Sequence, residues 1–220
     1  MDINYGGFVP LSTVDWFGNS VAVVFFRGCS LGCKDCLNKT IIDGENLVDI
    51  ETLKQKILGS KIAISGVVFT GGEPCEQIGV LTHLIYWCKS KELKVFLHTS
   101  GNKPKELGVV VRLLDGIRLD YKPKEQFGEG VSEKRDTYLA NYIWSKFIIL
   151  SADIPYWFSS VALRNSNQSL KDEYEGITSK KEQLIIMQGN EENPFTPEEL
   201  QEKYKNCYIY TKENGLQWSS

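Results

Sequence analysis

Three cysteines stand close together near the start of this sequence. Cys29, Cys33 and Cys36 are spaced C-x3-C-x2-C directly after the apolar run Val21–Phe26. Thiolates are soft ligands that select zinc or iron-sulfur clusters. A cube-shaped iron-sulfur cluster is ordinarily held by four cysteines, so three leave one iron free to bind a group other than protein. The spacing therefore predicts a cluster that does chemistry.

Structural zinc is the competing interpretation of the same cysteines. Such a site normally has four tetrahedral ligands, brought in pairs by two loops. Here a fourth ligand would have to come from Cys75, Cys207 or a histidine far along the chain. A second motif, Thr70–Pro74 with the sequence TGGEP, follows another apolar run and favours the cluster.

Together, the cysteine spacing and Thr70–Pro74 resemble the radical S-adenosylmethionine superfamily. In that family the open iron binds the amino and carboxylate groups of S-adenosylmethionine. One electron from the cluster then cleaves this molecule to methionine and a 5'-deoxyadenosyl radical. The segments Val9–Trp16 and Val23–Cys29 are most similar to the activating proteins of anaerobic ribonucleoside-triphosphate reductase, which install a glycyl radical on their partner.

The resemblance implies a set of cofactors and partners. Cys29, Cys33 and Cys36 would hold one 4Fe-4S cluster, with S-adenosylmethionine as the second cofactor. The substrate would be a glycine of anaerobic ribonucleotide reductase or of another glycyl-radical protein. Electrons would come from a reductant of the flavodoxin or ferredoxin type.

The glycine motif has a role in this resemblance. Gly71 and Gly72 alone would indicate only a tight turn. In the family their backbone approaches the methionine end of the cofactor, Glu73 accepts a hydrogen bond from its ammonium group, and Pro74 stiffens the exit of the loop.

Two further groups of polar residues are candidates for cofactor binding. Thr99 and Ser100 are either a cap at the end of a strand or, by resemblance, lie near the ribose or methionine carboxylate. Asp120 and Lys122 alternate along a strand and so share one face, where inward charges need each other or a ligand. They are either a surface pair or, as in the aspartate-x-lysine of the activating enzymes, contact the cofactor or the partner's backbone.

Some positions depart from the family pattern or leave alternatives open. Asp35 stands where many members have an aromatic residue that packs on adenine, so adenine contacts must come from elsewhere. His98 stands where related enzymes carry an aspartate near a monovalent cation. Histidine cannot fill that role in the same charge state, so the resemblance does not carry a cation site over to this position. Arg164 is either a contact of the methionine carboxylate or a solvated helix charge. Cys75 is a reactive thiol or, as we favour, a small wall residue.

Strand-like and helix-like segments alternate along the chain. The expected strands are Val21–Phe26, Val67–Thr70, Val95–His98, Ile117–Tyr121, Phe147–Ser151 and Leu184–Met187. The expected helices are Asp49–Leu58, Glu76–Lys91, Pro104–Leu114, Glu133–Trp144 and Trp157–Asn165. This alternation predicts an α/β fold with a mostly parallel sheet, right-handed crossovers and six units in a partial (β/α)6 barrel.

The expected domain is a single radical S-adenosylmethionine domain over residues 1–220. Its core covers about 15–190, and a C-terminal helix and short strand lie within 196–216. In the second helix the apolar residues Ile78, Leu81, Ile85 and Cys88 share one face, so Cys88 is a core residue. Thr196 precedes Pro197 and acidic residues, which is typical of a helix N-cap.

The polar motifs follow successive strands. Because ligands of parallel sheets lie outside the carboxyl ends of the strands, we expect these motifs to line one cleft at that edge of the sheet.

The composition of the chain argues against several classes of protein. The 220 residues are 42% hydrophobic and 24% charged with a net charge of -3, as in globular proteins, and no basic block indicates a nucleic-acid partner. The longest apolar run is too short to span a membrane, and Met1–Asn4 shows no export signal, so we expect a cytoplasmic protein with reduced cysteines.

Two other functions remain open at this point. One is a small-molecule radical enzyme similar to 7-carboxy-7-deazaguanine synthase, which shares the short architecture and the Gly-Gly-Glu-Pro motif. The other is a non-catalytic zinc-binding adaptor that has kept the fold.

Overall fold

The computed structural model describes residues 1–127, 132–163, 184–188, 195–204, 207–211 and 214–219. Within these ranges ten strands form one sheet in the order β10-β9-β8-β7-β6-β5-β4-β2-β1-β3. The strands are β1 (Asp2–Ser12), β2 (Val21–Phe26), β3 (Leu47–Asp49), β4 (Gly66–Gly71), β5 (Lys94–Thr99), β6 (Gly116–Tyr121), β7 (Tyr156–Ala162), β8 (Leu184–Gln188), β9 (Cys207–Thr211) and β10 (Gly215–Ser219).

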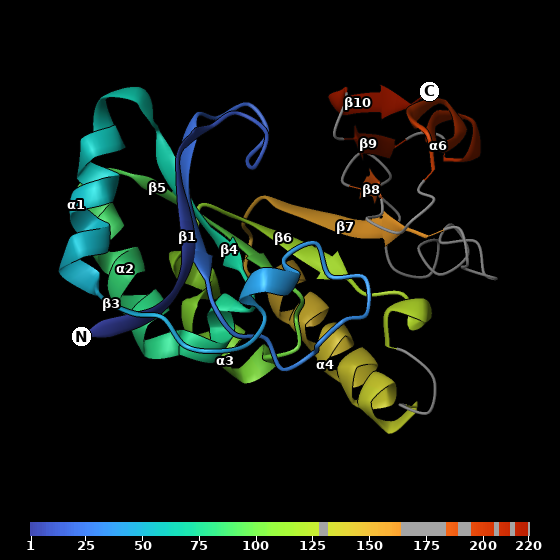
Figure 1. The fold of residues 1–220 in the computed structure, drawn as a ribbon, viewed down its shortest axis with the longest axis horizontal. Coiled ribbons are helices and arrows are strands. Elements are labelled where there is room, and N and C mark those ends of the chain that lie inside the picture. The colour runs from blue at the N-terminus through green and yellow to red at the C-terminus, as the bar shows by residue number, and fades with distance from the viewer. Residues whose placement is uncertain (128–131, 164–183, 189–194, 205–206, 212–213, 220) are drawn as a thin grey trace.

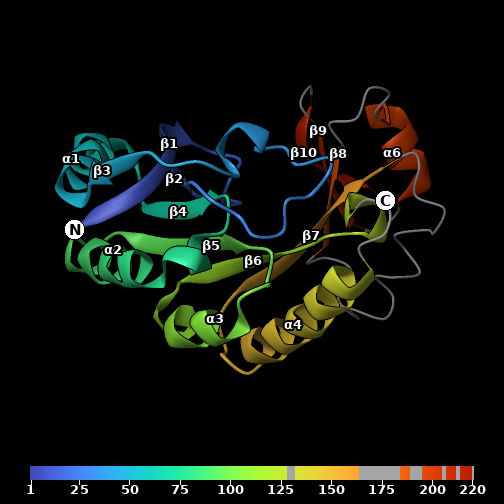
Figure 2. The ribbon, with the colours of Figure 1, turned by 60° about the horizontal axis from the view of Figure 1, so that its bottom comes forward.

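The centre of the sheet is parallel, as the sequence predicts. Strands β2, β4, β5, β6, β7, β8 and β9 pair in parallel, whereas β1, β3 and β10 join the two edges antiparallel to their neighbours. The α-helices are α1 (Ile50–Ser60), α2 (Ile78–Ser90), α3 (Pro104–Val110), α4 (Ser132–Leu150) and α6 (Pro197–Lys203). Figures 1 and 2 show α2, α3 and α4 along the same side of the central strands.

The core follows from the apolar pattern. The first four residues of β2 are completely buried, as expected for a strand of a parallel sheet that is covered on both faces. In α2, Leu81, Ile85 and Cys88 are buried in the main core, which confirms the predicted face and the structural place of Cys88. Thr196 begins α6 with a complete capping box to Glu199, which confirms that N-cap. No helix within the described ranges is long and apolar enough to cross a membrane.

The order of elements between 147 and 165 was predicted wrongly. Phe147–Ser151, expected as a strand, belongs to the last turns of α4 and the residue that follows it. Its apolar run is a helical one, because Ile149 is buried while Phe147 is 64% exposed. The expected helix Trp157–Asn165 is instead strand β7 as far as Ala162, and its last residues lie outside the described ranges.

Two serines explain why β7 was missed. Ser159 and Ser160 are fully buried, which is unusual for polar residues in the middle of a strand. Their hydroxyls donate hydrogen bonds to Asp120 Oδ1 at 2.8 Å and to the Tyr121 carbonyl oxygen at 3.0 Å, both on the neighbouring β6. The sequence alone does not reveal these partners, so the segment lacks a strand signal. The edge strands β1, β3 and β10 were also not predicted.

Candidate functional site

The polar motifs of four strand ends meet in one cleft. Strands β2, β4, β5 and β6 are consecutive parallel neighbours, so the loops after them leave the sheet at the same edge. The residues from the sequence motifs that line the cleft are Cys29, Cys33, Cys36, Thr70, Gly71, Gly72, Thr99, Ser100, Asp120 and Lys122. Glu73 and Pro74 are not in this lining.

The three cysteines are free thiols in the loop that follows the carboxyl end of β2. Cys33 is buried, and Cys29 and Cys36 are half-buried. Burial, followed by the nearby Glu73 carboxylate, raises the pKa of Cys29 to about 12. Burial also raises the pKa of Cys33, although Lys122 opposes this effect. The Asn38 N–H donates a 3.3 Å hydrogen bond to Cys36 Sγ, the kind of contact that tunes the potential of a cluster.

The loop that carries the cysteines is fastened to the glycine motif by backbone hydrogen bonds. The Glu73 N–H donates to the Gly28 carbonyl oxygen and the Gly72 N–H to that of Phe26, each at 2.8 Å. The side-chain amide of Asn38 donates to the Gly71 carbonyl oxygen at 2.9 Å. A Cβ atom on Gly72 would lie 2.0 Å from the Gly28 carbonyl oxygen, so this close approach requires glycine.

Glu73 lies behind the wall of the cleft. Its carboxylate accepts hydrogen bonds from the Cys75 N–H, the Thr99 hydroxyl, and both the N–H and the hydroxyl of Ser100, at 2.6 to 3.1 Å. The side chain is 1% exposed, and a buried carboxylate requires such donors. In this structure Glu73 therefore joins the loop after β4 to the end of β5. Its contact with a cofactor ammonium group stays a prediction.

Asp120 of β6 and Lys122, the residue that directly follows this strand, form an ion pair that faces the cleft. Burial alone would lower the pKa of Lys122, but the Asp120 carboxylate and the Cys33 thiol raise it, so Lys122 is a permanent positive charge beside the cysteines. Ser159 donates to the other oxygen of Asp120. The pair is therefore not a solvated surface contact.

The positions that depart from the family pattern can be placed as well. His98 is buried, and desolvation together with Arg118 holds its pKa well below the usual range, so the imidazole is neutral. Its Nε2 lies 2.9 Å from the Asp15 carbonyl oxygen. A neutral ring beside a guanidinium offers no negative charge to a cation, and whether a cation binds there stays a prediction. Asp35 lines the cleft.

Cys75 is completely buried, 3.9 Å from the Thr99 hydroxyl, and burial raises its pKa well above the usual range. A buried neutral thiol argues against the reactive alternative. Cys75 belongs to the main core and is not in the lining of the cleft, so its place as a wall residue stays a prediction. Arg164 lies outside the described residues.

Three polar lining residues were not identified from the sequence. Asn38 and Arg118 lie in the wall of the cleft, and so does Gln126, whose side-chain oxygen is buried without a hydrogen-bond partner. Asn38 follows the last cysteine by two residues, which is a signal that could have been used. Gln126 and Arg118 belong to no motif, so only the fold reveals them.

The donor set fits an iron-sulfur cluster. Three thiols and Lys122 line one cleft. Each thiolate that holds a cluster binds a different iron, so three thiols can hold three of the four irons. Across the residues that the structure describes, no three histidine, cysteine, aspartate or glutamate side chains are arranged to hold a single metal ion.

The chain has an α/β fold with a mostly parallel sheet, and two solved structures share this fold. The chain superimposes with a TM-score of 0.50 and 17% identity on QueE from Escherichia coli, over 84% of this chain and 82% of that one. It also superimposes with a TM-score of 0.53 and 17% identity on native anSMEcpe with bound AdoMet, over 80% of this chain and 55% of that one. These likenesses concern the fold.

Sequence comparison narrows the class. Residues 18–121 match the family described as 4Fe-4S single cluster domain. The chain is 27% identical over 134 residues to a protein of Methanocaldococcus jannaschii named as a glycyl-radical enzyme activating enzyme, covering 59% of this chain and 55% of that one. It is 31% identical over 113 residues to the pyruvate formate-lyase-activating enzyme of Clostridium pasteurianum, covering 48% and 47%.

Residues 18–121 thus match a 4Fe-4S single cluster domain, and the chain is similar in sequence to proteins named as glycyl-radical enzyme activating enzymes. The matched family model is that of a 4Fe-4S cluster domain, and one of the solved structures with a similar fold holds bound AdoMet. The matches span about half the length of these relatives.

The buried Glu73 carboxylate gives a first prediction. Glu73→Gln replaces one acceptor oxygen by an amide that faces donors, so we expect a loss of about 1–3 kcal/mol in the free energy of unfolding. Glu45→Gln, at an exposed position, should change it by less than about 0.5 kcal/mol. Urea denaturation of both variants measures the difference, and equal midpoints would contradict the role given to Glu73.

The close approach of two glycines gives a second prediction. Gly72→Ala places a Cβ atom against the Gly28 carbonyl oxygen, so the cysteine loop must move and iron bound after anaerobic reconstitution should fall several-fold. Gly79→Ala in α2 is the matched control, because nothing lies within 4 Å of its added Cβ. A Gly72→Ala protein with the iron content and urea midpoint of the wild type would refute this account of the loop.

Proposed function

We propose that this chain is a radical S-adenosylmethionine enzyme that activates a glycyl-radical protein. The observation that carries the proposal is the meeting of three thiols, the Gly71–Gly72 backbone and the Asp120–Lys122 pair in one cleft. The names of the homologous activating enzymes support the same function.

When bound, the cluster would supply one electron and S-adenosylmethionine the group that accepts a hydrogen atom from a glycine, so that the products would be methionine, 5'-deoxyadenosine and a glycyl radical. The protein provides binding, orientation and exclusion of water. We assign the ligation of the cluster to Cys29, Cys33 and Cys36. The fourth iron is left for S-adenosylmethionine.

Other residues of the cleft would hold the cofactor. The Gly71–Gly72 backbone lines the cleft and would lie beside the methionine end of the cofactor. Lys122 brings a charge suited to the cofactor's carboxylate, and Asp120 holds that lysine in place. The hydroxyls of Thr99 and Ser100 line the cleft, but both already donate to Glu73, so they would contact a ligand as acceptors.

We propose anaerobic ribonucleotide reductase as the glycyl-radical partner, with a flavodoxin or ferredoxin as the electron donor. The N-terminal segments Val9–Trp16 and Val23–Cys29 support this choice of partner over other glycyl-radical proteins.

Cluster ligation gives the third prediction. After anaerobic reconstitution, Cys29→Ala, Cys33→Ala and Cys36→Ala should each lose the 4Fe-4S signal in the low-temperature EPR spectrum of the reduced protein and the cleavage of S-adenosylmethionine. Cys88→Ala removes a buried thiol of the α2 core and should keep both. Retention of a full cluster in any of the first three variants would overturn the ligand assignment.

The partner is tested separately. The reconstituted protein, S-adenosylmethionine and a reductant are mixed with purified anaerobic ribonucleotide reductase, and the expected product is the EPR doublet of a glycyl radical on the reductase. Formation of 5'-deoxyadenosine without that doublet would redirect the search to another glycyl-radical protein or to a small molecule. If the protein held zinc in place of iron and did not cleave S-adenosylmethionine, the result would favour the non-catalytic zinc-binding adaptor.

A further inference from the structure

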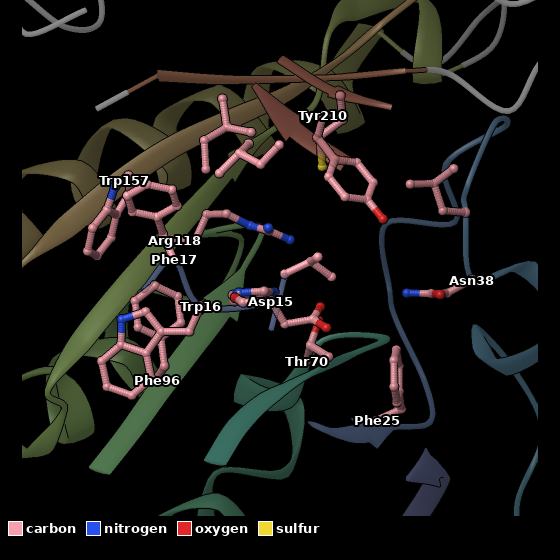
Figure 3. Close-up of a pocket in the computed structure, with 16 residues that line it drawn as sticks. Asp15, Trp16, Phe17, Phe25, Asn38, Thr70, Phe96, Arg118, Trp157 and Tyr210 are labelled. Atoms are coloured by element: carbon pink, nitrogen blue, oxygen red, sulfur yellow. The ribbon is translucent and has the colours of Figure 1, made fainter. Parts of the chain in front are cut away.

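Exposed apolar side chains gather at the opening of a cavity that adjoins the cleft. Val14, Phe17 and Leu37 line this cavity, whose volume is about 290 Å³. Figure 3 shows Phe17 and Arg118 among the residues around it. Because His98 and Arg118 line both spaces, the cavity belongs to the site described above. A second group of exposed apolar side chains lies on the outer side of helix α4 and has no part in that site.

The outer face of α4 is apolar along the second half of the helix. Four large side chains on this face are 45% to 64% exposed: Ile143, Trp144, Phe147 and Leu150. The opposite face of the same helix is buried in the main core through Tyr138, Tyr142 and Ile149. In Figures 1 and 2 the helix lies at the outside of the molecule, next to α3. The four exposed side chains therefore point away from the sheet.

This face also lacks charged residues. A helix that packs on one side normally carries charged and polar residues on the other. From Thr137 to Ala152 the sequence holds a single charged residue, Lys146. Its Nζ lies 5.9 Å from the centre of the Phe158 ring on β7, so this charge is directed toward the sheet and not toward the outer face. Large apolar side chains that gather in this way mark an interaction surface.

The spacing of residues along this face fits a second copy of the same helix. Successive members of one stripe are separated by three, four and three residues, as in packed helix pairs: Ala140, Ile143, Phe147 and Leu150. This order reads the same from both ends, so two antiparallel copies of α4 can meet at the centre of the stripe. Ala140 of one copy then lies opposite Leu150 of the other, and Ile143 lies opposite Phe147. The smallest residue of the stripe thus faces a large one, which lets the two helices pack closely.

The area of the patch also fits a pair of identical copies. An aromatic side chain offers roughly 150–250 Å², so four large side chains that are about half exposed leave roughly 300–400 Å² of apolar surface. Two copies face to face would therefore bury roughly 600–800 Å² of apolar surface. A small specific interface buries about 1,200 Å², of which about 65%, or roughly 780 Å², is apolar in homodimers. A partner with a polar surface would supply only half of that area.

We propose that two copies of this chain associate through the outer faces of their α4 helices, in an antiparallel contact with two-fold symmetry. Such a contact uses the same patch on both copies, so it closes on itself and stops at the dimer. The antiparallel arrangement also sets the positive end of each helix dipole beside the negative end of the other. The inference concerns assembly and does not depend on the proposed function.

A dimer of this kind leaves the cleft open. The inner face of α4 holds two of the loops that border the cleft. The Lys122 N–H donates a 2.8 Å hydrogen bond to the Tyr138 hydroxyl, and the Ser145 hydroxyl donates a 2.7 Å hydrogen bond to the Gly101 carbonyl oxygen. The exposed stripe lies on the other side of the helix, and its residues are not in the lining of the cleft.

Sedimentation velocity of the anaerobically reconstituted protein measures its mass as a function of concentration. We expect a monomer–dimer equilibrium for the wild type. Phe147→Glu places a carboxylate against Ile143 of the other copy, so the dissociation constant of the dimer should rise about 100-fold or more. Tyr86→Glu is the matched control, because Tyr86 of α2 is 58% exposed and lies outside the stripe, and this variant should dimerise as the wild type does. Iron content and melting temperature show whether each variant has folded.

Mixing two variants tests the antiparallel register. Ile143→Lys and Phe147→Glu should each be monomeric at concentrations where the wild type is a dimer. In an antiparallel mixed pair the new lysine of one chain faces the new carboxylate of the other, and the remaining Phe147 faces the remaining Ile143. The equimolar mixture should therefore form dimers where neither variant does so alone. A parallel pair would bring no opposite charges together.

Several results would overturn the inference. One is a wild-type protein that stays monomeric up to high micromolar concentration, and another is a folded Phe147→Glu protein that dimerises like the wild type. Species that grow beyond the dimer as concentration rises would indicate a contact between unlike patches instead. Loss of the dimer in both single variants without recovery in their mixture would refute the antiparallel contact.

Discussion

The cleft depends on one buried carboxylate. Glu73 follows β4, and its oxygens accept four hydrogen bonds from the loops after β4 and β5. Hydrogen bonds to a charged group are worth more than neutral ones, and an unpaired carboxylate at this depth would be costly. Its own N–H donates to Gly28, so the same residue holds the cysteine loop. Three strand ends are thereby fixed relative to one another before any cofactor binds.

The second organising feature is the face of β6 that carries charges. Arg118, Asp120 and Lys122 are spaced by two residues and therefore point to the same side of the sheet, while Ile117, Leu119 and Tyr121 are buried in the core on the other. Lys122 is next to the cysteines, and Arg118 borders the adjoining cavity, whose lining includes Trp16, Phe96 and Trp157. Residues of β6 therefore line both the cleft and the adjoining cavity. Asp120, bonded to Lys122 and to Ser159 of β7, keeps its charge compensated.

The sequence predicted the sheet best where burial is continuous. Strands β2, β4 and β5 were found from short apolar runs, because strands that are covered on both faces have little choice of residue. Strands β6 and β8 were found from shorter apolar stretches. The errors fell where tertiary contacts override local pattern. Ser159 and Ser160 of β7 are buried because β6 supplies acceptors, and Phe147 is exposed in spite of its apolar neighbours because it lies on the outer side of α4.

The sequence by itself determined the donor set and its order. Three thiols within eight residues must lie near one another, and a Gly-Gly-Glu turn after the next parallel strand must open at the same edge, because chain length and strand direction allow nothing else. Only the tertiary structure decided that Glu73 joins loops behind the cleft, that His98 is neutral, and that the buried Nε of Arg118 has no hydrogen-bond partner among the described residues. These properties depend on which side chains from distant strands come within hydrogen-bond distance, and that is set by the packing of the whole sheet.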